Sequence, residues 1–149
     1  MPRFRSGDLT VAQQYHSLRF SSALTGGSGF IRRGALHWQI EIAPSPLSRF
    51  YSLKIYYKPP ASPTVVVTAP DLVDLAGGRK LPHVYSQQPP TLCLYLPGSG
   101  EWRPTMLVER TILPWSILWL FYFEEWIDSD DWKGGGVHPK LKNAANTLN

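Results

Sequence analysis

Residues 35–43 alternate between apolar and polar side chains, and this pattern limits the possible folds more than any other feature of the sequence. Successive side chains of a β-strand point to opposite faces, so strict alternation predicts a strand with one buried face. Residues 50–58 repeat the pattern after a Pro-Ser-Pro turn, and residues 64–68 add three consecutive valines between prolines. The sequence therefore predicts three strands in an antiparallel meander. The side chains expected to share buried faces are Leu36, Trp38, Ile40, Ile42, Tyr51, Leu53, Ile55 and Tyr57.

Two further segments predict helices before and after the meander. Residues 9–24 carry apolar side chains at helical spacing behind a Gly7-Asp8 start, and three glycines end the segment. Residues 111–126 are nearly all apolar, with Pro114 where the first turn of a helix tolerates proline. The uninterrupted part is shorter than the roughly 20 apolar residues of a membrane span. We therefore expect a buried, aromatic-rich helix and no membrane segment.

The chain length of 149 residues and a hydrophobic content of 43% predict one packed core. We expect a single α+β domain over residues 1–149, with an ordered core at about 8–139 and a flexible tail at 140–149. The N-terminus has no apolar stretch of signal-peptide length, which predicts a cytoplasmic protein. No motif predicts a cofactor or a metal.

The formal charge of +4 comes from basic residues scattered along the chain. Proteins that bind nucleic acid usually concentrate their basic residues on one face, often with aromatic residues between them. Scattered charge favours a mildly basic solvated surface, so we expect no nucleic-acid partner. A nucleic-acid binding module remains an alternative, which strong salt dependence of polynucleotide binding would reveal.

Cys93 is the only cysteine, which excludes an internal disulfide and a multi-cysteine zinc site. A lone cysteine is most often a small core residue. Residues 91–96 alternate, however, so an extended conformation would turn Leu92, Leu94 and Leu96 to the core and Cys93 outward. An outward-facing position of Cys93 favours a reactive thiol.

His83 and Tyr85 precede Cys93 in a Pro- and Gly-rich segment, residues 71–104, that is too long for a simple hairpin loop. A thiolate is the reactive form, so the site needs a local donor or cation. We expect His83 to hold the loop or to stabilise an oxyanion, because no neighbouring carboxylate in the loop orients its ring. His138 is either a base or a structural loop histidine. Glu101 and Asp128 are further candidates to take a proton from an amine.

Leu81-Pro82-His83-Val84-Tyr85, followed by Leu92-Cys93-Leu94, resembles the His-Pro-Asn loop and the cysteine of ubiquitin-conjugating enzymes. The preceding order of helix and meander is similar to that family too. Here Leu81 stands in place of the family's His and His83 in place of its Asn, and the interval from Tyr85 to Cys93 is longer. The resemblance implies a ubiquitin-conjugating-enzyme-like fold and a cysteine that carries an acyl group as a thioester.

A narrower resemblance joins this loop to the residues that follow it. Together they are similar to the conjugating-enzyme-like proteins of bacterial cyclic-oligonucleotide anti-phage signalling systems (CBASS), of the short type II kind. The similarity spans about residues 36–139. The motifs that carry it after Cys93 are Glu101-Trp102, Thr111-Ile112-Leu113-Pro114-Trp115, Trp119-Leu120, Trp132, Gly134-Gly135-Gly136 and His138-Pro139.

This resemblance implies a partner, a cGAS/DncV-like nucleotidyltransferase whose C-terminal tail would form a thioester with Cys93 and then be joined to an amine. The implied catalytic residues are Cys93, His83 and Tyr85. Two alternatives remain open. One is a non-catalytic scaffold that binds the nucleotidyltransferase, and the other is a cysteine hydrolase in which Cys93 acts with His83 or His138.

Overall fold

The structure is a computed structural model that describes residues 7–135. The predicted flexible tail at 140–149 and His138 lie outside these residues.

The fold is α+β, as predicted, with a six-stranded antiparallel sheet in the order β1-β2-β3-β4-β6-β5. The strands are β1 (Ser28–Arg32), β2 (Ala35–Ile42), β3 (Tyr51–Tyr57), β4 (Thr64–Ala69), β5 (Val84–Gln87) and β6 (Pro90–Leu92). The helices are α1 (Val11–Arg19), α2 (Leu72–Leu75) and α3 (Ile112–Ser129), with a 3₁₀ turn, η1 (Val108–Arg110), before α3.

The predicted meander is confirmed in its three strands and in their buried face. Leu36 pairs with Tyr57 and Ile42 with Tyr51, so the apolar side chains of β2 and β3 lie on one side of the sheet. All eight predicted core residues of these two strands are buried. In β4, Val65 and Val67 are buried and Val66 is half-buried, so this strand also has one core face.

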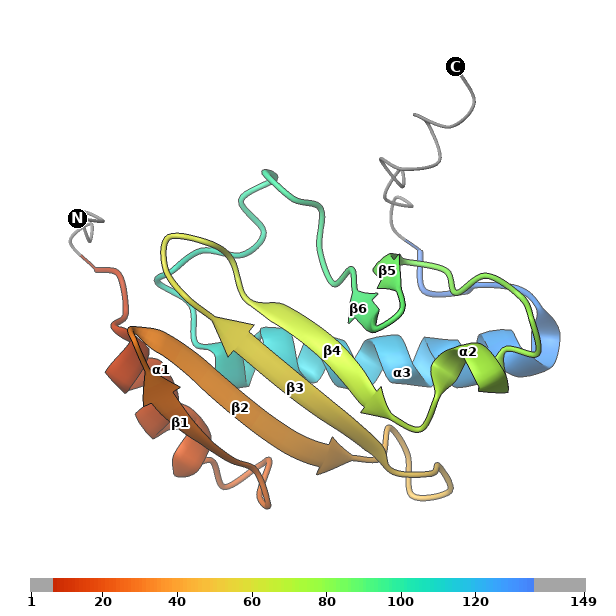
Figure 1. The fold of residues 1–149 in the computed structure, drawn as a ribbon, viewed down its shortest axis with the longest axis horizontal. Helices are drawn as coiled ribbons and strands as arrows, with labels where there is room; N and C mark the ends of the chain where they lie inside the picture. The colour runs from red at the N-terminus through yellow and green to blue at the C-terminus, as the bar shows by residue number, and fades with distance from the viewer. Residues whose placement is uncertain (1–6, 136–149) are drawn as a thin grey trace.

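Helix α3 lies along the buried face of the sheet (Figure 1). It begins one residue later than predicted and extends to Ser129, with Pro114 in its first turn. The helix ends where Asp130 adopts the left-handed conformation and its N–H donates to the carbonyl of Trp126 at 2.8 Å. Within residues 7–135, no helix combines the length and the apolarity needed to cross a membrane.

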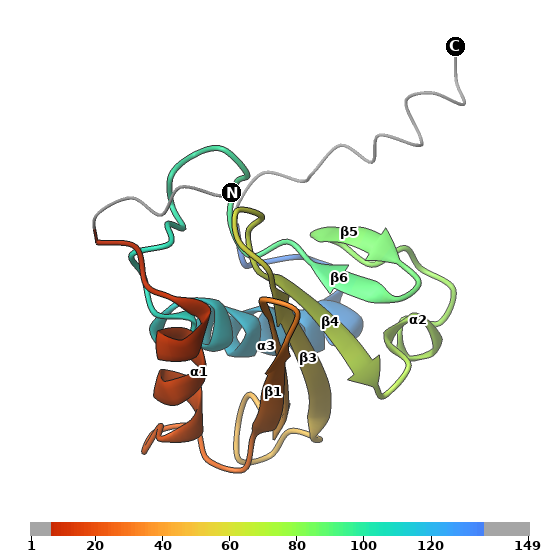
Figure 2. The same ribbon diagram turned by 60° about the vertical axis from the view of Figure 1, so that its left-hand side comes forward.

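Helix α1 is shorter than the predicted 9–24 and packs near β1 and β2 at one edge of the sheet (Figure 2). It begins after Thr10, not at the Gly7-Asp8 pair. The Thr10 hydroxyl accepts from the N–H of Gln13, and the Gln13 side chain accepts from the N–H of Thr10, which together form a capping box. The glycines predicted to end the helix lie beyond it, and Gly29 belongs to β1.

The segment 71–104 contains structure that the sequence pattern did not predict. It forms the short helix α2 and the hairpin of β5 and β6, and β6 pairs with β4 through Val66 and Thr91. The hairpin therefore extends the meander sheet. Its position places the residue that follows β6, Cys93, at the end of this extension.

Candidate active site

The backbone of the loop before β5 fixes the position of Cys93. The N–H of Cys93 donates to the carbonyl of His83 at 3.0 Å. The same carbonyl accepts from the indole N–H of Trp119, on α3, also at 3.0 Å. His83 has a positive φ of 49°, a conformation that is uncommon for residues other than glycine and is found mostly at Asn, Asp and His. An unusual backbone turn at His83 therefore links the thiol segment to the central helix.

The Cys93 thiol is half-buried and donates to the carbonyl of Tyr95 at 3.6 Å. The Tyr85 hydroxyl donates to the same carbonyl at 3.4 Å. Desolvation raises the pKa of Tyr85 above its usual value, and the hydrogen bond and the charge of the neighbouring Cys93 raise it further. The structure thus brings Tyr85 and Cys93 together, although seven residues separate them.

The predicted alternation over residues 91–96 is only partly correct. Leu92 is buried, but Leu94 is half-buried and Leu96 is 49% exposed. The strand ends at Leu92, so the residues after it leave the sheet and no longer alternate between its faces. Cys93 is consequently not an outward-facing strand residue. It lies at the wall of a cavity.

This cavity has a volume of about 470 Å³, and both His83 and Cys93 line it. The imidazole of His83 stacks on the indole of Trp132, with 5.0 Å between ring centroids and 25° between planes. Glu101 also lines the cavity, whereas Asp128 is exposed on α3 and does not. The remaining walls are mostly apolar or aromatic and consist of Leu94, Tyr95, Leu96, Trp115, Leu118, Trp119, Tyr122, Trp132, Gly134 and Gly135.

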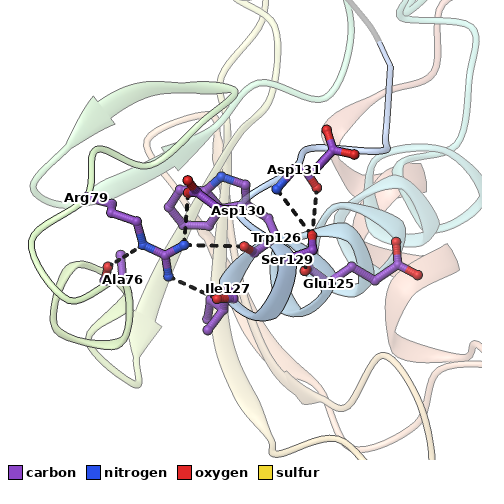
Figure 3. Close-up of polar contacts among 8 residues, drawn as sticks. All are labelled: Ala76, Arg79, Glu125, Trp126, Ile127, Ser129, Asp130 and Asp131. Carbon is purple, nitrogen blue, oxygen red and sulfur yellow. Dashed lines mark hydrogen bonds and ion pairs between the residues drawn. The ribbon is translucent and has the colours of Figure 1, made fainter.

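Arg79 joins the loop before the site to the end of α3 (Figure 3). Its guanidinium donates to the carbonyls of Trp126 at 3.4 Å and Ile127 at 3.1 Å, and to Asp130 at 3.1 Å. It also lies over the Trp126 ring, 4.4 Å from the centroid. Both carbonyls lie in the last turn of α3, where the helix dipole makes a cation favourable.

The sequence analysis missed Arg79, because its contacts are with residues about fifty positions away and no local motif marks them. The contact has a consequence for the site. Asp130 is two residues before Trp132, whose ring stacks on His83. Arg79 therefore holds together two segments that form one wall of the cavity.

The described part of the chain contains no cluster of side chains that could form a metal site. Among residues 7–135 no three His, Cys, Asp or Glu side chains gather closely enough to hold a metal ion. The chemistry available at the cavity is that of a thiol, a phenol, an imidazole and a carboxylate beside aromatic walls.

The family model for the type II CBASS E2 protein matches residues 16–139. The chain belongs to this family. The matched region begins within α1 and includes the whole sheet, Cys93 and α3. Membership in the type II CBASS E2 family supports a role in CBASS and confirms the resemblance that the sequence motifs indicate. No curated protein matches the sequence.

Proposed function

We propose that this CBASS E2 protein is an acyl carrier. In this proposal Cys93 forms a thioester with the C-terminal carboxylate of a cGAS/DncV-like nucleotidyltransferase and passes that acyl group to an amine, which primes cyclic-oligonucleotide signalling. The observation that carries the proposal is the half-buried thiol of Cys93 in the wall of a 470 Å³ cavity, in a chain that belongs to the E2 family of CBASS.

The surroundings of the thiol support this chemistry. A nucleophilic cysteine needs access for its substrate and a neighbour that favours the thiolate. The cavity supplies access, and the Tyr85 hydroxyl beside Cys93 supplies a hydrogen-bond donor. The backbone hydrogen bonds at His83 keep Cys93 in place, which agrees with a loop-holding role for His83.

The transfer takes place in two steps. First, the Cys93 thiolate attacks an activated carboxyl group of the donor, either an acyl adenylate or a thioester on an activating enzyme. A carbon–sulfur bond forms, and the nucleotide or the first thiol leaves with its electron pair. Second, an amine attacks the thioester, a carbon–nitrogen bond forms, and the Cys93 thiolate leaves. The amine proton goes to water or to Glu101, the carboxylate that lines the cavity.

Co-expression with a cGAS/DncV-like nucleotidyltransferase tests the proposal. Because Cys93 is the only cysteine, any thiol-sensitive adduct of this protein must involve it. We expect an adduct on non-reducing gels that disappears with reductant and is absent from Cys93→Ala. A Tyr122→Phe variant changes the same cavity but keeps the thiol, so it serves as a control that should still form the adduct.

Two other outcomes would replace the proposal. Equal binding of the partner by the native chain and Cys93→Ala, with no adduct in either, would indicate a scaffold. Release of a shortened partner without any product joined to an amine would indicate a cysteine hydrolase.

A further inference from the structure

The face of the sheet opposite α3 carries a row of aromatic side chains across three strands. The strand register pairs Phe30 of β1 with His37 of β2, and His37 with Tyr56 of β3. The rings of Phe30 and His37 stack at 4.7 Å between centroids with 14° between planes, and Tyr56 meets His37 edge-on at 5.1 Å. Phe30 is 55% exposed and Tyr56 is 43% exposed, so the row is open to solvent.

A second row lies beside the aromatic one and forms a hollow with it. The register aligns Ser28, Gln39 and Lys54 across the same three strands. Both rows line a depression of about 320 Å³. A bound group could therefore contact an aromatic ring, a cation and two polar side chains together.

The positive charge of the chain is concentrated in this part of the structure. Residues 28–58 contain five basic residues and one acidic residue, a formal charge of +4 that equals the charge of the whole chain. The remaining residues therefore contain ten basic and ten acidic side chains. Within the described part of the chain, none of the five basic residues forms an ion pair. These residues are Arg32, Arg33, Arg49, Lys54 and Lys58.

Several of these cations flank the aromatic row. Arg32 lies two residues after Phe30 within β1, so the two share a strand face, and Lys58 directly follows the end of β3. Lys54 lies on the other side of the row, two residues before Tyr56. Residues that are scattered in the sequence are thus brought to one face by the meander register.

We propose that this face binds single-stranded nucleic acid. Exposed aromatic rings stack on unpaired bases, and flanking cations bind the phosphates, which is how sequence-tolerant single-strand surfaces work. Cross-strand aromatic pairs also stabilise a sheet without any ligand. Sheet stability alone, however, does not explain the hollow or the concentration of basic residues without ion pairs. This inference departs from the expectation, drawn from sequence spacing, of no nucleic-acid partner.

The site is separate from the proposed thioester chemistry. Phe30 lies on the edge strand β1, whereas Cys93 follows β6, on the far side of β2, β3 and β4 in the strand order. Binding at this face requires no thiol, so the two proposals can fail independently.

Fluorescence anisotropy with a labelled single-stranded oligonucleotide tests the inference on the full chain. The same sequence as a duplex and an inorganic polyphosphate serve as controls. We expect the single strand to bind more tightly than either control. The double variant Phe30→Ala, Tyr56→Ala should weaken binding by about tenfold or more. Phe20→Ala removes an aromatic ring that is 66% exposed at the end of α1, and it should leave binding unchanged.

Variants of the basic residues provide a second test, because they leave the aromatic row unchanged. The logarithm of the affinity falls as the logarithm of the salt concentration rises, and removing one phosphate contact from a single-strand site makes this slope less steep by about 0.7. We expect this decrease for Arg32→Ala and for Lys54→Ala, but not for Arg103→Ala, and Cys93→Ala should bind like the native chain. Absence of binding at low salt would overturn the inference. Equal binding of polyphosphate, unaffected by the loss of Phe30 and Tyr56, would also overturn it and indicate only general attraction of anions.

Discussion

The backbone amide of Cys93 donates to the carbonyl of His83 at 3.0 Å, so these two residues are joined through the main chain. The thiol position therefore depends on the backbone conformation at His83, where φ is 49°. It depends as well on Trp119, which donates to the same carbonyl from the central helix. The role of His83 in the fold can thus be separated from the chemistry of its imidazole.

Substitutions at His83 should rank by their tolerance of the left-handed conformation. His83→Asn and His83→Ala both lose the ring that stacks on Trp132, but Asn adopts positive φ more readily than Ala. We expect His83→Asn to be the more stable variant by about 1 kcal/mol, measured by urea unfolding. Equal stability of the two variants would show that the backbone conformation at this position contributes little.

Arg79→Ala should destabilise the end of α3 and loosen the cavity wall. The substitution removes charged hydrogen bonds to the carbonyls of Trp126 and Ile127, for which we expect a loss of about 1–3 kcal/mol in unfolding free energy. Arg79→Lys keeps the charge and should recover part of this loss. Arg103→Ala, which removes an exposed arginine, is the matched control and should change stability little. A similar loss for both alanine variants would show that Arg79 has no special role at the helix end.

Tyr85→Phe should slow the reaction of Cys93 with an alkylating reagent. The substitution removes the phenol that interacts with Cys93, and the loss of one hydrogen bond at a nucleophile corresponds to a change of between about two- and tenfold in rate. The measurement is the rate of iodoacetamide modification, followed by intact mass at constant pH. Tyr122→Phe, in the same cavity, should react at the native rate. Faster alkylation of Tyr85→Phe would mean that Tyr85 shields the thiol instead.

Stability should fall at alkaline pH because of Tyr51. This residue is fully buried, and its hydroxyl donates to Glu124 at 2.9 Å. Desolvation raises its pKa above the usual 10, and the hydrogen bond and charge of Glu124 raise it further. Above about pH 10 the unfolded chain loses this proton while the folded state keeps it. The contribution of Tyr51 to the unfolding free energy is therefore fully present below about pH 10. As the pH rises above this value, the unfolding free energy should decrease by about 1.4 kcal/mol per pH unit for this one proton.

Urea unfolding between about pH 8 and about pH 11.5, a range that spans the ordinary tyrosine pKa, measures this dependence. Tyr51→Phe should reduce the alkaline slope by the contribution of one proton, and the exposed Tyr56→Phe should leave it unchanged. An unchanged slope in Tyr51→Phe would disprove the assignment to Tyr51.

The meander could be predicted because its strands are long and half-buried, so each strand shows its own alternation. Strand β1 shows none, and its Gly29 was predicted only to help end the preceding helix. It forms because Gly29 allows a close approach: an added Cβ would lie 2.1 Å from the carbonyl oxygen of His37. Only the pairing with β2 reveals that this glycine is a strand residue.

The candidate site was only partly visible in the sequence. The motif around Cys93 indicated the family, and it named His83 and Tyr85, both of which the structure places beside the cysteine segment. The cavity itself could not be predicted, because its walls come from α3 and from the residues after it. Leu96 was assigned to the core from an alternation that stops where β6 ends.

The intact mass of Cys93→Ser after co-expression with the nucleotidyltransferase tests the acyl-carrier proposal without relying on a labile bond. An oxygen in place of the sulfur would convert the thioester into a more stable ester. We expect a reductant-resistant species whose mass is the sum of the two proteins less one water, with the substituted side chain joined to the partner's C-terminal residue. If Cys93→Ser stays unmodified, in cells where the native chain also carries no partner, Cys93 is not an acyl carrier.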